Sequence, residues 1–305
     1  MLLSILLLLG GALALYLGAE WIVRGGSQYA LRLGLSPTIV GLTIVAFGTS
    51  LPELIVSLIA ALEETNTIAI GNIVGSNVAN VGLVLGLSAF IFPVTIIFSK
   101  IKYDLIFYLV VCAFFVWFCW NGYIGRGEGI ILFIGIILYT SYCFLHPQGR
   151  VEAVSEGTLS SGKCVVLLLS GVLLLGVGAY YFIDGAVQLA RFLGVSEIVI
   201  GMSIVALGTS LPELATSVVA AFRKESGISI GNIIGSNLFN ILSVIGLVSV
   251  VHPLTVPTSI LTREVPFMIG FGVVLLPLAI MRQPISRISS SLLIIGYGLF
   301  LWILF

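Results

Sequence analysis

Charged residues are scarce in this sequence. Only 9% of its 305 residues are Asp, Glu, Lys or Arg, whereas about a quarter are charged in a typical soluble domain. Hydrophobic residues account for 59%, and the net charge is zero. This composition excludes a water-soluble globular protein. We expect the lipid bilayer as its surroundings, and neither nucleic acid nor an obligate protein as a partner.

Cysteine and histidine are also rare, and neither forms a motif. His146 and His252 fall at the ends of apolar runs. The four cysteines lie in or at the ends of apolar runs, without the clustering of a metal site or a disulfide framework; they are Cys112, Cys119, Cys143 and Cys164. A serine hydrolase is disfavoured, because Ser50 and Ser210 have no nearby His or Lys to act as a base. We therefore expect no enzyme activity, no cofactor and no soft metal.

Long apolar runs fill most of the chain, and each approaches the roughly 20 residues that a helix needs to cross a bilayer. The first run lacks the basic region of a signal peptide and has a counterpart later in the chain, so it is expected to remain as a membrane helix. The predicted fold class is an all-α integral membrane protein. About ten transmembrane helices are expected, at residues 2–23, 37–62, 68–93, 103–121, 128–146, 164–184, 197–222, 228–252, 264–281 and 288–305.

Basic residues are distributed unevenly between the two sides that alternate loops would occupy. One side receives ten Lys and Arg residues, and the other receives three, namely Arg126, Arg191 and Arg263. Short cytoplasmic loops collect Lys and Arg. Both termini are therefore expected outside the cell membrane.

The chain repeats itself with an offset of 160 residues. IVAFGTSLPEL at 44–54 recurs as IVALGTSLPEL at 204–214, and GNIVGSNVAN at 71–80 recurs as GNIIGSNLFN at 231–240. Each half holds five expected spans, and an odd number of spans forces the halves into opposite orientations. The sequence therefore predicts two inverted five-helix repeats with a cytoplasmic linker between them, with boundaries at 1–147, 148–163 and 164–305.

One glutamate lies deep in an apolar span of each half. Glu53 is the only charged residue within 33–62, and Glu213 is the only one within 198–222. A carboxylate near the bilayer centre costs about 2.5–3.5 kcal/mol, so such a residue usually faces a cavity on a transport path. No Lys or Arg lies deep in a span, so the two glutamates must bind protons or cations. The acids near span ends are interpreted as interfacial: Glu20, Asp104, Asp184 and Glu197.

Further oxygen ligands surround each glutamate. Pro52 and Pro212 lack an amide hydrogen and free carbonyl groups in the preceding turn. Hydroxyl groups precede each carboxylate by about one turn, at Thr49, Ser50, Thr209 and Ser210. In the second motif, small residues four apart allow close helix packing, which would bring in Ser76, Asn77, Asn80, Ser236, Asn237 and Asn240. Carboxylate, carbonyl and hydroxyl oxygens are the ligands of a hard cation such as calcium or sodium.

These two motifs resemble the alpha repeats of the cation/calcium exchanger superfamily, specifically its prokaryotic sodium/calcium exchanger branch. The resemblance implies ten helices, of which the second, third, seventh and eighth form the ion site and the first and sixth slide across it. It makes Glu53 and Glu213 the shared ligands of calcium and sodium, with backbone carbonyls from Thr49 and Thr209. It assigns the sodium positions to Ala46, Ser50 and Ser236 near Glu53, and to Ala206, Ser210 and Ser76 near Glu213, with Asn80 and Asn240 completing the middle.

The sequence therefore predicts a secondary active antiporter that exchanges calcium for sodium by alternating access. Some superfamily members have an aspartate in place of Asn240, and this departure disfavours the potassium-dependent branch. A calcium/proton antiporter stays open as an alternative, because protonation of Glu53 and Glu213 would neutralise the site equally well. A cation channel is the alternative from another class, although two opposed half-sites fit alternating access better than a continuous pore.

Overall fold

The computed structural model describes residues 1–146, 159–195, 206–281 and 283–304, and helices dominate throughout. The helices of the first half are α1 (Leu2–Leu33), α2 (Pro37–Val40), α3 (Ala46–Thr49), α4 (Leu51–Leu62), α5 (Asn66–Ala79), α6 (Gly86–Ile91), α7 (Phe98–Cys119) and α8 (Arg126–Leu145). Those of the second half are α9 (Ser161–Phe192), α11 (Ala206–Gly208), α12 (Leu211–Phe222), α13 (Ser226–Leu238), α14 (Gly246–Val251), α15 (Val265–Ile280) and α16 (Arg287–Leu304). One loop from each half contributes to a two-stranded antiparallel sheet, made of β1 (Tyr123–Ile124) and β2 (Leu254–Thr255).

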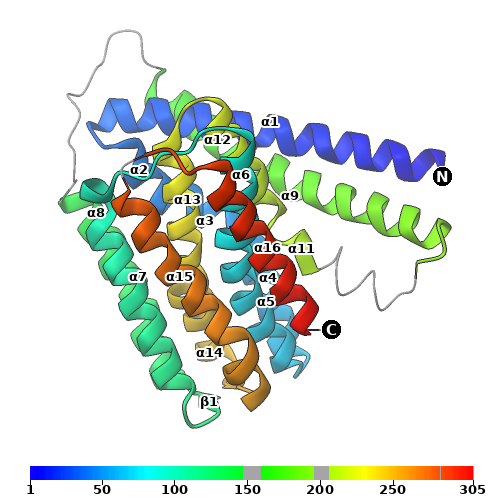
Figure 1. Cartoon of the computed structure of the whole chain (residues 1–305), viewed down its shortest axis with the longest axis vertical. Helices are drawn as coiled ribbons and strands as arrows, with labels where there is room; N and C mark the ends of the chain where they lie inside the picture. The colour runs from blue at the N-terminus through cyan, green and yellow to red at the C-terminus, as the bar shows by residue number, and fades with distance from the viewer. Residues whose placement is uncertain (147–158, 196–205, 282, 305) are drawn as a thin grey trace.

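The two longest helices, α1 and α9, lie side by side and cross the other helices steeply (Figure 1). Their backbones touch at glycines. A Cβ atom at Gly11 would lie 2.8 Å from the carbonyl oxygen of Gly178, and one at Gly18 would lie 2.8 Å from that of Gly171. The partner number falls as the residue number rises, so the two helices are antiparallel. The buried small residues of this contact recur every seven positions, at Ser4, Gly11, Gly18 and Gly25 and at Cys164, Gly171, Gly178 and Gly185.

The centre of the molecule consists of α5–α6 and α13–α14. In their most apolar stretches 78% and 89% of residues are buried, against 28% in α1 and 22% in α16. These central helices carry the asparagines of the second motif, and Asn77, Asn80, Asn232, Asn237 and Asn240 are all buried. Many apolar side chains of α1 and α16 are exposed on the surface of the protein, as expected for helices in contact with lipid.

Both central helices contain a π-helical segment, η2 (Asn80–Leu85) and η4 (Phe239–Ile245). A third, η1 (Gly41–Val45), precedes α3, and a fourth, η5 (Ile260–Glu264), precedes α15. A π segment widens the helix by about one residue per turn and is often found at functional sites. Asn80 opens η2 and Asn240 lies within η4, so the widened turns coincide with the second motif.

The expectation of about ten spans is confirmed in part. Within the described residues, eight helices are long and apolar enough to cross a membrane, and the pair Pro37–Thr49 and Leu51–Leu62, bent by 42°, makes a ninth. The shorter apolar helix α12 stands where a tenth span was expected. Residues 196–205 before it, with Glu197, lie outside the described residues, as does most of the expected linker.

The expected limits of two spans differ from the ends of the helices. The first and sixth spans were expected to end near residues 23 and 184, but α1 and α9 continue to Leu33 and Phe192. Each has 32 residues, so a strong tilt is needed to fit a bilayer. Asp104, which was expected near the membrane interface, lies in the second turn of α7, is 7% exposed and accepts a hydrogen bond of 3.0 Å from the hydroxyl of Tyr139. That bond offsets the cost of burying its side chain.

Candidate ion-binding site

Each half breaks a helix just before its glutamate. Ser50 separates α3 from α4 with φ −84° and ψ 3°, and Ser210 separates α11 from α12 with φ −83° and ψ 2°. A proline follows in the first turn of each new helix, where its missing amide hydrogen does no harm. Glu53 and Glu213 therefore lie in the first turn of α4 and α12 rather than well inside a helix. The positive end of the helix dipole favours a carboxylate there.

The two glutamates are fully buried, with 0% of each residue exposed. Both carboxylate oxygens of Glu53 and Oε2 of Glu213 have no hydrogen-bond partner among the described residues. The ion pairs Arg223–Glu20 and Arg263–Glu264, which lie within the described residues, do not involve the carboxylates of Glu53 and Glu213. The two carboxylates are close enough to repel each other. Because burying uncompensated charge is costly, this arrangement calls for cations or protons.

Hydroxyl groups from both halves surround the carboxylates. Ser50 Oγ donates to Oε1 of Glu213 across the interface between the halves, at 3.4 Å. Thr49, Ser50 and Ser236 lie beside Glu213, whereas Ser76 and Thr209 lie beside Glu53. The resemblance implied sodium positions that use Ser50 and Ser236 near Glu53, and Ser76 near Glu213, and this assignment stays a prediction. The contact of Ser50 with Glu213 shows that the segment after α3, which packs against α13 of the other half, reaches the opposite carboxylate.

The remaining expected ligands differ in their surroundings. Ser210 Oγ is buried and has no hydrogen-bond partner among the described residues. The carbonyl oxygen of Ala46 accepts from Thr49 Oγ1 at 3.3 Å and from the Ser50 amide at 3.0 Å. A cation at Ala46 would share this oxygen with both donors. Ala206 begins α11, and its side chain is not among those described.

Two asparagines that the sequence did not single out fix the geometry of the helix breaks. Asn72 donates to Ser57 Oγ at 3.0 Å and to the backbone carbonyl of Glu53 at 3.4 Å, and it accepts from Thr209 Oγ1 at 3.2 Å. Asn232 makes the same three bonds, to Ser217, Glu213 and Thr49, at 3.1, 3.4 and 3.0 Å. Each asparagine thus connects the break of its own half to a threonine of the other half. Identical polar residues at repeat-related positions were the signal that would have revealed them.

An amide cluster formed by Asn77, Asn80, Asn237 and Asn240 lies between α5–η2 and α13–η4. Asn80 Nδ2 donates to Asn237 Oδ1, and Asn240 Nδ2 donates to Asn77 Oδ1, both at 3.0 Å. These bonds use the donor ends of Asn80 and Asn240. Their Oδ1 atoms are buried and have no hydrogen-bond partner within the described chain. Each half therefore leaves one buried amide oxygen of this cluster without a donor among the described residues.

Six buried oxygens of the residues expected at the ion site lack hydrogen bonds from described residues. They are Glu53 Oε1 and Oε2, Glu213 Oε2, Asn80 Oδ1, Asn240 Oδ1 and Ser210 Oγ. Calcium takes six to eight oxygen ligands from carboxylates, carbonyls and hydroxyls. The described residues contain no group of three or more His, Cys, Asp or Glu side chains that would suit a transition metal.

Comparison with known proteins assigns the chain to a family. The family described as "Sodium/calcium exchanger protein" matches residues 3–145 and 163–305. The chain belongs to the sodium/calcium exchanger family. Members of this family are transporters in membranes, so the multi-pass, all-helical organisation expected from the sequence is confirmed at this level.

Relatives and a solved structure of the exchanger family cover nearly the whole chain. It is 32% identical to the inner membrane protein YrbG of Escherichia coli, over 99% of this chain and 96% of that protein. It is 31% identical to the sodium/calcium exchanger MaX1 of Methanosarcina acetivorans, over 99% and 98%. A structure of the sodium-calcium exchanger NCX_Mj superimposes with a TM-score of 0.88 at 32% identity, covering 100% of this chain and 99% of that one.

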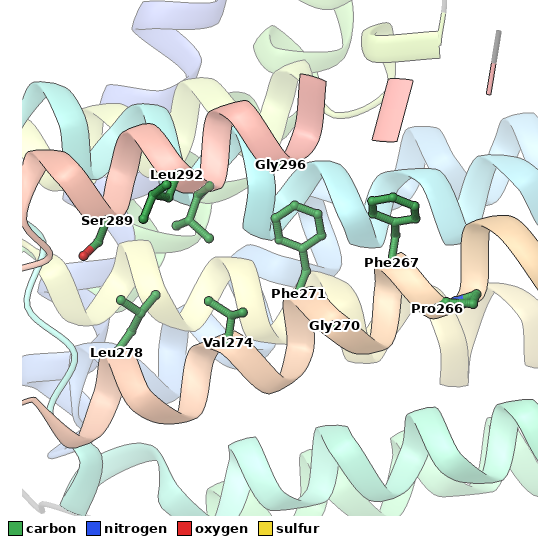
Figure 2. Close-up of a pocket in the computed structure, with 10 residues that line it drawn as sticks. Pro266, Phe267, Gly270, Phe271, Val274, Leu278, Ser289, Leu292 and Gly296 are labelled. Atoms are coloured by element: carbon green, nitrogen blue, oxygen red, sulfur yellow. The ribbon is translucent and has the colours of Figure 1, made fainter. Parts of the chain in front are cut away.

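A large cavity of this exchanger lies away from the glutamates. It is an apolar groove of about 630 Å³ between α15 and α16 (Figure 2). Phe267, Phe271 and Leu278 line it from α15, and Leu292 and Gly296 line it from α16. No charged side chain contributes to this lining. The apolar lining of this groove contrasts with the buried polar residues of the central helices.

Proposed function

We propose that this chain exchanges calcium for sodium across the membrane by alternating access at the site formed by Glu53 and Glu213. The observation that carries the proposal is the pair of buried carboxylates at repeat-related helix breaks, with no basic partner among the described residues. The unpaired oxygens of Asn80, Asn240 and Ser210 would complete the coordination of the transported ions. Calcium and sodium are the substrates, and no cofactor is needed.

Charge balance explains why the transport would be an exchange. One calcium ion neutralises two carboxylates, and sodium ions can do the same in its place. An empty site would leave two uncompensated charges in a poorly solvated interior, where effective Coulomb energies are several-fold larger than in water. The protein would therefore change its accessible side easily only when cations fill the site. Exchange without a net leak follows from that energetic rule.

The membrane arrangement is part of the same proposal. Two inverted five-helix repeats, with boundaries at residues 147 and 164, would make ten helices and place the glutamates near the middle of the bilayer. The termini would lie outside and the connection at 148–163 would be cytoplasmic, because most of the Lys and Arg residues fall on that side. In this arrangement α1 and α9 cross the site-bearing helices as one antiparallel pair.

A calcium/proton antiporter is the second candidate, because two protons would also neutralise the glutamates. The amide oxygens favour sodium. Protons bound to Glu53 and Glu213 neutralise charge but do not coordinate Asn80 Oδ1 and Asn240 Oδ1, which lack hydrogen bonds among the described residues. A sodium ion would bind both kinds of oxygen.

Calcium-45 uptake into proteoliposomes tests the proposal. Purified protein is reconstituted with sodium inside, and uptake is started by dilution into choline, potassium or sodium medium at constant pH. We expect uptake that requires an outward sodium gradient. Uptake that follows an imposed pH gradient, with sodium absent, would favour the proton antiporter. Conduction of calcium down its gradient without any counter-ion would favour a channel.

A further inference from the structure

The helices α7 and α15 occupy equivalent positions in the two halves and flank the amide cluster. Tyr108 on α7 and Met268 on α15 are repeat mates, 160 residues apart, and both are fully buried. The hydroxyl of Tyr108 accepts a hydrogen bond from Asn237 Nδ2 at 3.2 Å, and the sulfur of Met268 lies 3.7 Å from Asn77 Nδ2. Each outer helix therefore contacts the asparagine that in turn holds Asn80 or Asn240.

We propose that Tyr108 is a positioning residue for cation binding, which acts through Asn237 to direct the amide oxygen of Asn80 toward the transported ion. This inference rests on the proposed function and adds a residue to the site that no sequence motif contains. Tyr108 would not touch the cation. Its hydroxyl would fix whether the oxygen or the NH₂ group of Asn80 faces the ion, through the orientation of the Asn237 amide.

The physical basis is the two-ended character of the asparagine amide. Its oxygen only accepts and its nitrogen only donates, so a chain of amides has two possible directions. Tyr108 Oη is the acceptor for Asn237 Nδ2, and this turns Asn237 Oδ1 toward Asn80 Nδ2. The oxygen of Asn80 is then left for the cation. Reversal of Asn237 would oppose two NH₂ groups, and relief of that clash would turn the donor end of Asn80 toward a positive ion.

The two halves differ in how firmly they fix this direction. Asn77 Nδ2 has a second acceptor besides Met268, the backbone carbonyl of Asn237 at 3.3 Å. A thioether is a weak acceptor, so the carbonyl alone can orient Asn77. For Asn237 Nδ2, the hydroxyl of Tyr108 is the acceptor that the described residues provide. Loss of the Tyr108 hydroxyl should therefore matter more than loss of the Met268 sulfur.

The test is calcium binding to full-length protein, measured by calcium-45 equilibrium dialysis in detergent, together with exchange kinetics in proteoliposomes. Tyr108→Phe removes the hydroxyl and keeps the ring. The net contribution of one buried hydrogen bond is about 1 kcal/mol, so we expect a Kd for calcium about five- to tenfold higher. The exchange rate at saturating calcium should fall less than KM rises. Met268→Leu should raise Kd by a smaller factor.

Tyr139→Phe is the matched control. It makes the same change at another buried tyrosine, whose hydroxyl donates to Asp104 on the neighbouring helix instead of to the amide cluster. Its Kd for calcium should equal that of the native protein, even if its thermal unfolding temperature falls. A general effect of losing a buried hydroxyl would change both tyrosine variants alike, and that result would overturn the inference.

A double-mutant cycle identifies the route of action. If Tyr108 acts through Asn237, Tyr108→Phe should change Kd by less than about twofold in an Asn237→Ala background. Full additivity of the two changes would overturn the inference, as would a native Kd in Tyr108→Phe. Absence of calcium binding by the native protein would instead overturn the proposed function. The two failures are thus distinguishable.

Discussion

The helix breaks of the two halves are nearly identical, whereas the loops that follow the broken helices differ in charge. Ser50 and Ser210 have φ and ψ of −84° and 3° and of −83° and 2°. The loops after α4 and α12 also share a left-handed residue, with φ 59° at Glu64 and φ 62° at Lys224. Yet Glu63–Glu64 of one loop is replaced by Arg223–Lys224 of the other.

This difference separates two kinds of constraint on a repeated chain. At the centre the halves contact each other through Ser50 and Glu213, and in the proposed function both halves supply oxygens to one ion site, so the same oxygens and the same backbone are needed twice. At the loops, equivalent positions in inverted halves would face opposite sides of a membrane, and only the cytoplasmic side collects basic residues. The backbone turn is kept because it ends the helix, and its charge varies because its surroundings vary.

The largest effect is expected from removing one charge of the central pair. Glu53→Gln and Glu213→Gln should each lower sodium-driven calcium uptake at least about 100-fold, equivalent to about 2.7 kcal/mol, because one carboxylate cannot balance a divalent ion. Glu64→Gln, the same change at an exposed loop position, is the control and should transport normally. Near-normal uptake by either central variant, at native expression, would show that the halves do not share one site.

An all-or-none result is expected from labelling the two loops. Glu64→Cys and Lys224→Cys are placed in a background without Cys112, Cys119, Cys143 and Cys164, which are buried thiols. An impermeant maleimide added to intact cells should label Glu64→Cys and leave Lys224→Cys unlabelled until the cells are opened. The reverse pattern would refute the proposed orientation of the chain.

A weaker but measurable loss is expected at the glycine contact of α1 and α9. Gly18→Ala and its repeat mate Gly178→Ala each place a methyl group less than 3.0 Å from backbone atoms of the partner helix. We expect a destabilisation of about 1–3 kcal/mol from overpacking, and slower exchange. Gly10→Ala and Gly176→Ala, in the same helices, meet no atom within 4 Å and serve as controls. Equal thermal unfolding temperatures in detergent for all four variants would contradict the close contact.

The repeat explains what the sequence could predict. A buried carboxylate in an apolar span and its copy 160 residues later indicated the site and its residue types, because both signals survive without knowledge of packing. The contact of Ser50 with Glu213 could not be predicted, because the direction of Ser50 depends on the turn at the break and on α13 of the other half. The spacing of residues along one helix predicts neither the turn at the break nor the packing against the other half.

The ends of α1 illustrate the same limit. The first span was expected to end near residue 23, but the residues after it, including Arg24 and Arg32, belong to a helix that continues to Leu33. A helix of 32 residues is longer than a bilayer requires, so its basic end can extend beyond the apolar region while the backbone stays helical. Hydropathy predicts the limits of the segment inside the bilayer, whereas the helix itself ends at its cap. The cap of α1 is Gly34, with φ 65°.

The smallest effect on calcium uptake is expected from potassium, because the two halves present neutral amides at Asn80 and Asn240. In the proposed site Asn80 and Asn240 would contribute oxygens without charge, so the site would hold at most two negative charges, which one calcium ion balances. An added potassium ion would leave net positive charge in a poorly solvated interior. We therefore expect sodium-driven calcium uptake to be the same with potassium or with choline on both sides. A strict potassium requirement in the native protein would contradict this assignment.

Replacing one amide by a carboxylate sharpens the comparison. Asn240→Asp would set a carboxylate oxygen against Asn77 Oδ1, where the native amide donates at 3.0 Å, so the variant needs a proton or another cation at that point. We expect an altered KM for calcium, by about threefold or more, and uptake that becomes sensitive to pH or to potassium. Asn80→Asp faces Asn237 Oδ1 at the same distance and should change in the same direction. If only one of the two variants differs from the native protein, the amides of the two halves are not equivalent in transport, in spite of their matching geometry.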